Sequence, residues 1–259
     1  MKRRSLFCTA IISILFLPVF LSDAQQTNTL PNGAQYIGEM KDGKPNGHGT
    51  EVRPHEYKYE GEFKDGQFDG QGTLAYRGRR YVGSFKAGKR DGQGTETLSD
   101  GRLMYEGGFK DDVHNGRGTN VDLSGQVYIG EFKDGHETGQ GTFTTPWGLK
   151  YVGGFKDENF DGQGTVTFSD GTKYVGGFKH NKYEGQGTLI IPNQDTYVGE
   201  FKDGEPEGQG AVTYPDGRQY VGQILHGING SGKMTYPDGK VENGLWKDGK
   251  FLGTDKSPP

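Results

Sequence analysis

Residues 197–217 read Tyr-Val-Gly-Glu-Phe-Lys-Asp-Gly-Glu-Pro-Glu-Gly-Gln-Gly-Ala-Val-Thr-Tyr-Pro-Asp-Gly. Two Asp-Gly pairs, at 203–204 and 216–217, are turn signals because Gly readily adopts the positive φ that tight turns need. Between the turns, side chains alternate with a period of two, so that Tyr197, Gly199 and Phe201 share one face. The stretch therefore predicts a β-hairpin followed by a return turn.

The same alternation predicts how the two strands of the hairpin fit together. Gly208 and Gly210 of the second strand fall on the face that carries Tyr197 and Phe201 of the first. A ring that lies over a bare glycine backbone supplies the contact that glycine itself lacks. We expect both glycines to act as sockets for aromatic rings.

This unit recurs along most of the chain, and we number the units by their tyrosines. The intervals are 22 to 24 residues, and Glu242 begins a tenth, incomplete unit. A single hairpin is marginally stable in water, so the units must pair with one another. The fold class predicted is all-β, an elongated single antiparallel sheet of tandem hairpins. The nine tyrosines are Tyr36, Tyr59, Tyr81, Tyr105, Tyr128, Tyr151, Tyr174, Tyr197 and Tyr220.

The composition fits such a fold and argues against an ordinary globular enzyme. Gly supplies 47 of the 259 residues, and hydrophobic residues supply only 30%. Gly weakens helix interiors by roughly 1 kcal/mol each relative to Ala, so a helical domain is excluded.

The pattern Tyr-x-Gly-x-Phe-Lys-Asp-Gly, three residues, Gly-x-Gly-Thr and a closing Asp-Gly resembles the MORN repeat family, from Tyr36 to about Gly253. The resemblance implies a non-catalytic module without a cofactor, because in that family the repeats accompany separate catalytic domains. Two units depart from the pattern. The ninth has Ile224-Leu225-His226 in place of Phe-Lys-Asp, and the tenth stops after a first strand with Trp246 in the Phe position. Such changes are expected where a stack ends.

The start of the chain differs from the array. Lys2, Arg3 and Arg4 precede an apolar run, 6–21, and Ser22-Asp23-Ala24 supplies small residues suited to cleavage, as in a secretory signal peptide. The alternative is an uncleaved anchor, although about 20 apolar residues are usual for a span. The domain organisation predicted is a signal peptide (1–24), a leader (25–35), the array (36–253) and a disordered tail (254–259). The protein is thus expected to be exported, to the periplasm or secreted if the source is bacterial.

Charge and metal-ligand patterns limit the partners. Cleavage removes three basic residues and one acidic residue and so lowers the net charge from −4 to −6, which disfavours nucleic acid. A lysine follows the aromatic position in nine units, but an aspartate usually comes directly after that lysine, so only weak contact with lipid headgroups is expected.

The metal-ligand pattern does not predict a metal site. Histidines of neighbouring units are about 10 Å apart, too far to share a zinc ion. The carboxylate pairs Asp65/Asp69 and Asp157/Asp161 are explained by turn chemistry, so no metal is predicted.

One position varies while the framework repeats. It lies two residues before the first Gly of Gly-x-Gly, on the aromatic face, and we call this column the stripe. Its aromatic members, Phe68, Phe160 and Tyr183, are candidate binding residues, and the alternative is that they extend the packed face. The stripe comprises Pro45, Phe68, Arg90, His114, Glu137, Phe160, Tyr183, Pro206 and Ile228.

Trp147 is a fourth candidate binding residue. It replaces the Asp of a return turn, while Thr145 occupies the usual aromatic or apolar position two residues earlier. The indole either folds back over that gap or projects outward, where it would anchor a glycan or protein contact.

These features indicate an exported, non-enzymatic repeat scaffold that binds another protein or associates with itself. The alternative is an envelope-surface module that binds lipid headgroups or glycans.

Cleavage after Ala24 is the first testable prediction. The expected mass of the exported protein is that of residues 25–259, because the charged, apolar and small-residue segments stand in the order that a signal peptidase recognises. Intact-mass spectrometry decides the question, and a product that retains Met1 or Cys8 would show that the segment is not removed.

Overall fold

The structure is a computed structural model that describes residues 27–254, and the predicted signal peptide (1–24) lies outside them. The described chain forms 21 strands in one antiparallel sheet, in which each strand pairs with its neighbours in sequence. It contains no helix, and thus none long and apolar enough to span a bilayer. The all-β prediction is therefore confirmed. The strands are β1 (Asn28–Thr29), β2 (Gln35–Lys41), β3 (Lys44–Arg53), β4 (Tyr57–Lys64), β5 (Gln67–Tyr76), β6 (Arg79–Lys86), β7 (Lys89–Leu98), β8 (Leu103–Lys110), β9 (Val113–Val121), β10 (Val127–Lys133), β11 (His136–Thr144), β12 (Lys150–Lys156), β13 (Asn159–Thr167), β14 (Lys173–Lys179), β15 (Lys182–Ile190), β16 (Thr196–Lys202), β17 (Glu205–Thr213), β18 (Gln219–Leu225), β19 (Ile228–Thr235), β20 (Val241–Lys247) and β21 (Lys250–Gly253).

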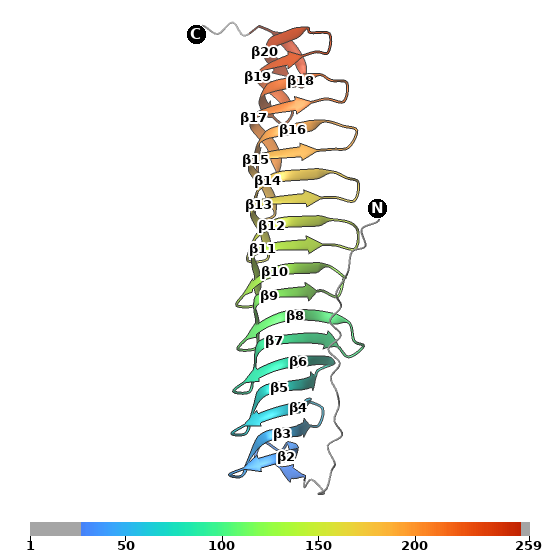
Figure 1. The fold of residues 1–259 in the computed structure, drawn as a ribbon. Helices are drawn as coiled ribbons and strands as arrows, with labels where there is room; N and C mark the ends of the chain where they lie inside the picture. Colours follow the sequence, from blue (N-terminus) through green and yellow to red (C-terminus); the bar gives the residue numbers. More distant parts are fainter. Residues whose placement is uncertain (1–26, 255–259) are drawn as a thin grey trace, which may run out of the picture.

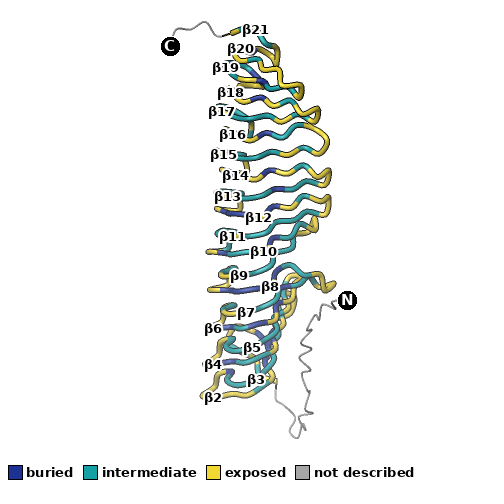
Figure 2. The backbone as a smooth tube through the Cα atoms, turned by 45° about the horizontal axis from the view of Figure 1, so that its top comes forward, coloured by how far each residue is buried: buried dark blue, intermediate teal, exposed yellow. Residues whose placement is uncertain are grey.

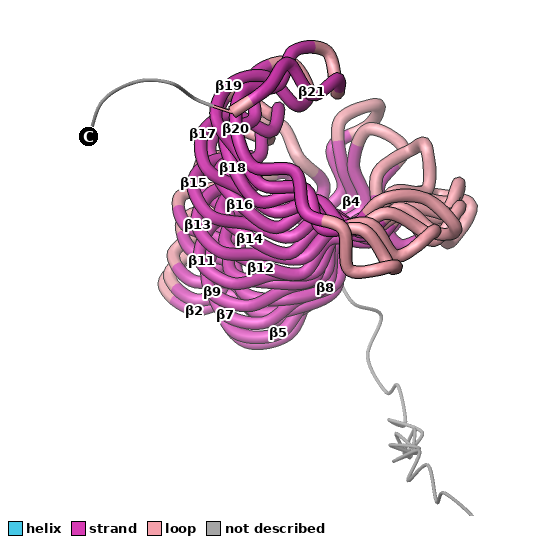
Figure 3. Tube along the Cα trace, turned by 90° about the horizontal axis from the view of Figure 1, so that it is seen from above, coloured by secondary structure: helices cyan, strands magenta, loops and turns pink. Residues whose placement is uncertain are grey.

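The sheet is long and single-layered, with the first units at one end and the last at the other (Figure 1). Seen along its axis, the strands are bent into stacked arcs (Figure 3). In β12, Tyr151, Gly153 and Phe155 are buried while Val152 is exposed. Short buried stretches recur in this way from unit to unit along the sheet (Figure 2). A single sheet can bury side chains only on the inside of its bend, so the aromatic face lines the inner side. We call this inner face the trough.

A bulge inside each hairpin produces the bend. In the hairpin of β12 and β13, Gly153 pairs with Gly164, yet the next pair is Phe155 with Phe160, so Gly154 faces three residues of the partner strand. A comparable register shift occurs in all nine complete units. Bulges bend a strand and increase its twist, which explains the curvature.

The framework tyrosine closes this bulge. The Tyr151 side chain is fully buried, and its hydroxyl donates a hydrogen bond of 2.9 Å to the carbonyl oxygen of Gly154, the bulged residue. All nine units have this bond from the tyrosine to the residue three positions later, at 2.8 to 3.0 Å. A buried carbonyl without a partner would cost about 1 to 3 kcal/mol, so each tyrosine satisfies a group that the bulge removes from the ladder.

The predicted sockets are confirmed at one of the two glycines and wrong at the other. A Cβ on Gly164, the second Gly of its Gly-x-Gly, would lie 2.4 Å from the Tyr151 hydroxyl oxygen, so the ring occupies that space. A Cβ on Gly162 would have no atom within 4 Å, but Gly162 has a φ of +90°. Gly162 lies in the bulge, where the backbone conformation and not a ring requires glycine.

Both ends of the array differ from the simple division into leader and repeats. Residues 28–33 contain β1 and a return turn, in which Leu30 and Gly33 make the same backbone bonds as Tyr214 and Gly217. The leader thus supplies the end of an earlier unit. At the other end, the prediction that the tenth unit stops after its first strand is wrong, because β21 pairs with β20 as the start of a second strand. Trp246 is buried against Tyr220, and its Nε1 donates to the Gly232 carbonyl at 2.9 Å.

The different surroundings of Gly162 and Gly164 predict that replacement by Val lowers the free energy of unfolding by different amounts at the two positions. Gly164→Val should destabilise the array by more than about 3 kcal/mol, because the side chain would displace the Tyr151 ring and break its hydrogen bond. Gly162→Val should cost about 1 to 3 kcal/mol, since only backbone strain opposes it. Denaturant unfolding measures both, and equal costs would contradict the distinction between socket and bulge.

Candidate functional site

Two columns of rings form the floor of the trough. Tyr151 makes edge-to-face contacts with Phe155 of its own unit, at 5.2 Å between centroids, and with Phe178 of the next unit, at 5.0 Å. The same alternation of tyrosine and phenylalanine links most neighbouring units. Edge-to-face aromatic pairs contribute about 0.5 to 1.5 kcal/mol each beyond burial. The columns therefore couple each unit to the next.

The stripe lies directly on the tyrosine column. Phe160 stacks on Tyr151 with 3.8 Å between centroids and 8° between planes, and Phe68 stacks on Tyr59 with the same values. Tyr183 lies on a tyrosine in the same way, at 3.8 Å and 14°. All three candidate rings are partly buried against the core and keep part of their surface exposed. They contribute to packing, and their role in binding stays a prediction.

Phe68 borders a hollow in the trough. The hollow has a volume of about 480 Å³, and its apolar walls are Phe68, Tyr57, Leu74 and Tyr76. Phe68 also contacts Tyr57 edge to face, at 6.0 Å between ring centroids. Recesses with mostly apolar walls are the usual form of a small binding site.

Trp147 projects away from the rings. Its side chain is 59% exposed in the return turn between β11 and β12, and it is not part of the packed cluster. Leu149 packs against the core beside that turn instead. The interpretation that Trp147 covers the gap at Thr145 is therefore wrong, and the outward orientation is the one found.

The stripe changes from apolar to polar in its middle. Arg90 lies over the Phe109 ring, 5.0 Å from its centroid, and forms ion pairs with Glu96 at 3.3 Å and Asp112 at 3.2 Å. Its guanidinium also donates to the Tyr76 hydroxyl at 3.1 Å. A stacked, multiply paired guanidinium of this kind is held in one place.

Glu96 is the buried partner of this network. Its side chain is only 4% exposed, and it accepts hydrogen bonds from Tyr76 at 2.7 Å and Arg79 at 3.0 Å. Burial alone would raise the pKa of Glu96, but these hydrogen bonds and the charge of Arg90 outweigh it and hold the pKa below its ordinary value. Glu96 is thus an anion fixed on the inner face.

His114 and Glu137 continue the polar segment. The His114 ring stacks on Tyr105 at 3.5 Å, and burial lowers the pKa of His114 to about 4, so the imidazole is neutral at pH 7. Burial raises the pKa of Glu137 to about 7, with Glu158 acting in the same direction and a hydrogen bond with Asn120 against it. No basic side chain of the described residues forms an ion pair with Glu137.

Glu137 therefore opposes folding once it ionises. Its folded-state pKa lies above the ordinary value of 4.5, so the stability that it contributes is present below pH 4.5 and is lost as the pH rises through about 7. A cationic group placed against the carboxylate would reverse this loss, because an opposite charge favours the ionised form.

Sequence reasoning missed the Arg90 network. Comparison of the units places Arg90, His114 and Glu137 on the stripe. The network also needs the residue that pairs with the framework tyrosine across the hairpin, which in the third unit is Glu96, opposite Tyr81. The signal was available in the alternation of the strands, since Glu96 falls on the same face as Arg90, six residues earlier.

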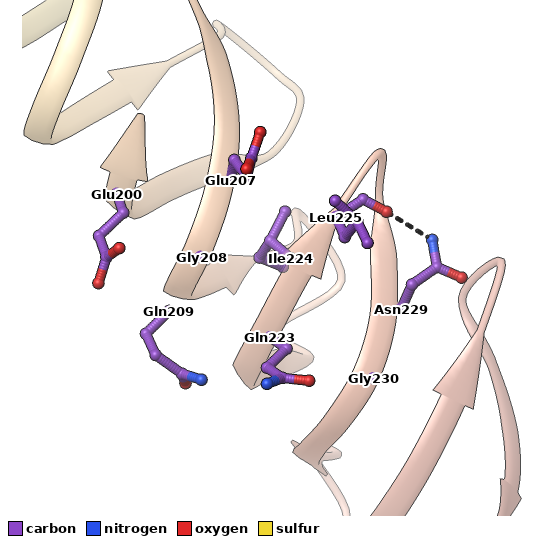
Figure 4. A pocket seen from close by; sticks show the side chains of 9 residues that line it. All are labelled: Glu200, Glu207, Gly208, Gln209, Gln223, Ile224, Leu225, Asn229 and Gly230. Atoms are coloured by element: carbon purple, nitrogen blue, oxygen red, sulfur yellow. Dashed lines mark hydrogen bonds between the residues drawn. The ribbon is translucent and has the colours of Figure 1, made fainter. Parts of the chain in front are cut away.

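Residues of β16 to β19 line a second hollow, of about 410 Å³ (Figure 4). Glu200 and Gln223 line it from the bulges, and Gly208 and Gly230 leave it open because they carry no side chain. The side-chain amide Nδ2 of Asn229 donates a hydrogen bond of 2.8 Å to the carbonyl oxygen of Leu225. No stripe residue lines this hollow, and residues 27–254 bring together no group of three or more side chains able to hold a metal ion.

Comparison with known proteins identifies the repeated unit. The family model described as the MORN repeat matches residues 36–54, 59–78, 81–101, 105–119, 128–150, 151–173, 174–196, 197–217 and 220–241, which is more than half of the chain. No curated protein matches the chain.

Two solved structures are similar to it. The G-box domain of the microcephaly protein CPAP has 12% identity and a TM-score of 0.25, with 86% of this chain and 100% of that chain covered. The TCP domain of SAS-4 (dCPAP) from Drosophila melanogaster, in complex with a proline-rich motif of Ana2 (dSTIL), has 14% identity and a TM-score of 0.17, with 93% and 96% covered. These TM-scores are too low for either structure to inform the function of this chain.

Proposed function

The chain belongs to the MORN-repeat family, and from that premise we propose that it is an exported, non-enzymatic scaffold whose trough binds another protein. The observation that carries the proposal is the stripe, a variable column on a repetitive framework. Seven of its nine members are only partly buried, and the other two, Pro45 and Ile228, are buried. The framework rings are buried, with at most 6% of their surface exposed, whereas Phe68, Phe160 and Tyr183 offer more surface to a partner.

The chemistry of the stripe describes the partner. Phe160 and Tyr183 provide an apolar segment in neighbouring units, and Glu137, in the unit before them, provides a carboxyl group that has no basic partner among the described residues. A protein segment that carries apolar groups next to a basic one would match this order along the trough. Aromatic side chains with partly exposed faces commonly dominate such interfaces.

The second candidate function is the binding of glycans or lipid headgroups. A single feature favours it, the exposed indole of Trp147, which suits stacking on a sugar ring or contact with headgroups. Trp147→Ser is the variant that separates this function from binding in the trough, because Trp147 lies in a return turn and not on the stripe.

Substitution of the apolar segment tests the proposed function. In the variant F160H/Y183H each ring is replaced by the imidazole that unit 4 already stacks on its tyrosine, so the melting temperature should change little. Capture of the partner from an envelope extract, identified by mass spectrometry, should fall at least about tenfold, because a polar ring replaces the apolar contact. The variant F160S/Y183S removes the stacking as well and should cost about 1 to 3 kcal/mol of stability.

The matched control is V152S/V175S, which changes exposed side chains on the outer face of the same units. Undiminished capture by F160H/Y183H would exclude the stripe as the binding surface. A loss that occurs only with Trp147→Ser would favour the second candidate function.

A further inference from the structure

Within the described residues, the strands next to the two ends of the sheet, β2 and β20, are each paired along only part of their outer edge. Among residues 27–254, β1 is the partner of β2 on the side away from β3, and it pairs only with Gln35 and Tyr36. On β20, residues 241–244 pair with β19 alone, because β21 covers only the part from Leu245 onward. Uncovered strand edges are sites at which another strand can be added.

The two short strands are complementary parts of one second strand. A complete second strand such as β13 has nine residues, of which the first two pair with Lys156 and Phe155. The strand β21 supplies the first four positions, because Lys250 and Phe251 pair with Lys247 and Trp246 in the same register.

The strand β1 supplies the last two positions of such a strand. Asn28 pairs with Tyr36 and Thr29 with Gln35, as Val166 and Thr167 of β13 pair with Tyr174 and Lys173. The strand β21 therefore holds the first four positions of a second strand and β1 holds the last two, so the two strands do not overlap.

We propose that copies of this chain join end to end. In the joint, β21 of one copy and β1 of the next lie in line and form one strand. This strand lies between β20 of the first copy and β2 of the second. The joint uses the two ends of the sheet and none of Glu137, Phe160 and Tyr183, so it is independent of the proposed function. The two ends lie at opposite extremes of the rod, which prevents them from meeting within one chain (Figure 1).

Charges at the two ends match. At two places within the array, the lysine that begins a second strand forms an ion pair with the Asp in the first turn of the next unit. The examples are Lys89 with Asp111, at 2.9 Å, and Lys182 with Asp203, at 3.2 Å. Lys250 and Asp42 occupy these two positions at the opposite ends of the chain. In the joint, Lys250 of one copy faces Asp42 of the next.

The apolar side chains match as well. In the array, a stripe residue packs on the phenylalanine of the next unit, as Phe68 does on Phe85 at 5.8 Å between centroids. Met40 holds the phenylalanine position of the first unit and is 40% exposed, whereas Phe85 is 4% exposed, since no described stripe residue packs on Met40 from a preceding unit. Phe251 holds the stripe position of the last unit and would cover Met40 in the joint.

The turns and the backbone complete the match. Gly88 N donates to the Phe68 carbonyl oxygen at 2.8 Å, and the equivalent groups at the ends are Gly43 N and the Phe251 carbonyl. Gly217 lies against Pro237 of the next return turn, while Gly239 has open space where a Cβ would point. The turn that would follow Gly239 is the one that contains Pro31 of the next copy.

Charge reversal at the joint tests the proposal by sedimentation velocity of the purified chain. The wild-type protein should show concentration-dependent, increasingly elongated oligomers. Lys250→Glu and Asp42→Lys should each weaken association about fivefold to tenfold, because a like-charge pair replaces an ion pair. The double variant K250E/D42K should restore it. A mixture of the two single variants should also associate more strongly than either variant alone, because every joint between one variant and the other has opposite charges.

Lys133→Glu, a reversal at an exposed lysine inside the array, is the control and should associate like the wild type. A wild-type protein that stays monomeric, or single variants that associate as strongly as it does, would overturn the proposal.

Cross-linking provides a second readout of register. In the array the fifth residue of a second strand faces the bulged residue of the next unit, as His48 faces Glu62. The corresponding pair at the joint is Thr254 and Glu39. In a background in which the only cysteine, Cys8, is replaced by Ser, E39C/T254C should oxidise to a ladder of disulfide-linked multimers. Each single-cysteine variant should give dimers at most, and a double variant without a ladder would contradict the register.

Discussion

A buried tyrosine hydroxyl that donates to the carbonyl of a bulged residue is the interaction on which the rest of the structure depends. The bulge takes the residue after the first-strand glycine out of the ladder, and the tyrosine three residues earlier satisfies it. To reach that carbonyl, the ring must lie flat over the backbone, and this is possible only because the glycine opposite has no side chain. The bulge bends the sheet, and the bend makes one face of the single layer concave. The rings are buried on this concave face without a second sheet or a helix.

This constraint divides each unit into fixed and free positions. The tyrosine, the phenylalanine and the glycines are tied to the bulge, and together they couple neighbouring units through edge-to-face contacts. The stripe lies above them and has to satisfy only one condition, that its side chain pack on a tyrosine ring. A phenyl ring, an imidazole and a guanidinium all meet that condition in this chain. The trough can therefore change its chemistry along its length without changing its shape.

The repeat itself could be predicted from the sequence, because Asp-Gly turns and period-two alternation are local signals. The socket at Gly164 also followed from alternation. The role of Gly162 did not, since a bulge shifts the register and so changes which residues face one another. The stripe was found by comparison of the units, but its stacking on the tyrosines needed the bend. The Arg90 and Glu96 network and the split strand at the two ends join residues of different units, and such pairings become visible only when the register between neighbouring strands is known.

The central claim is that the framework tyrosines are buried and hydrogen-bonded, and alkaline titration tests it most directly. Burial raises the pKa of Tyr36, Tyr81, Tyr105, Tyr128, Tyr151 and Tyr174 to about 12, so stability that depends on their neutral form is lost only as the pH rises above 10. Ultraviolet absorbance of the phenolates, followed together with circular dichroism, should show these tyrosines ionising near pH 12 and only as the β-sheet signal disappears. Ionisation of all 14 tyrosines near pH 10 with the sheet signal intact would contradict the account.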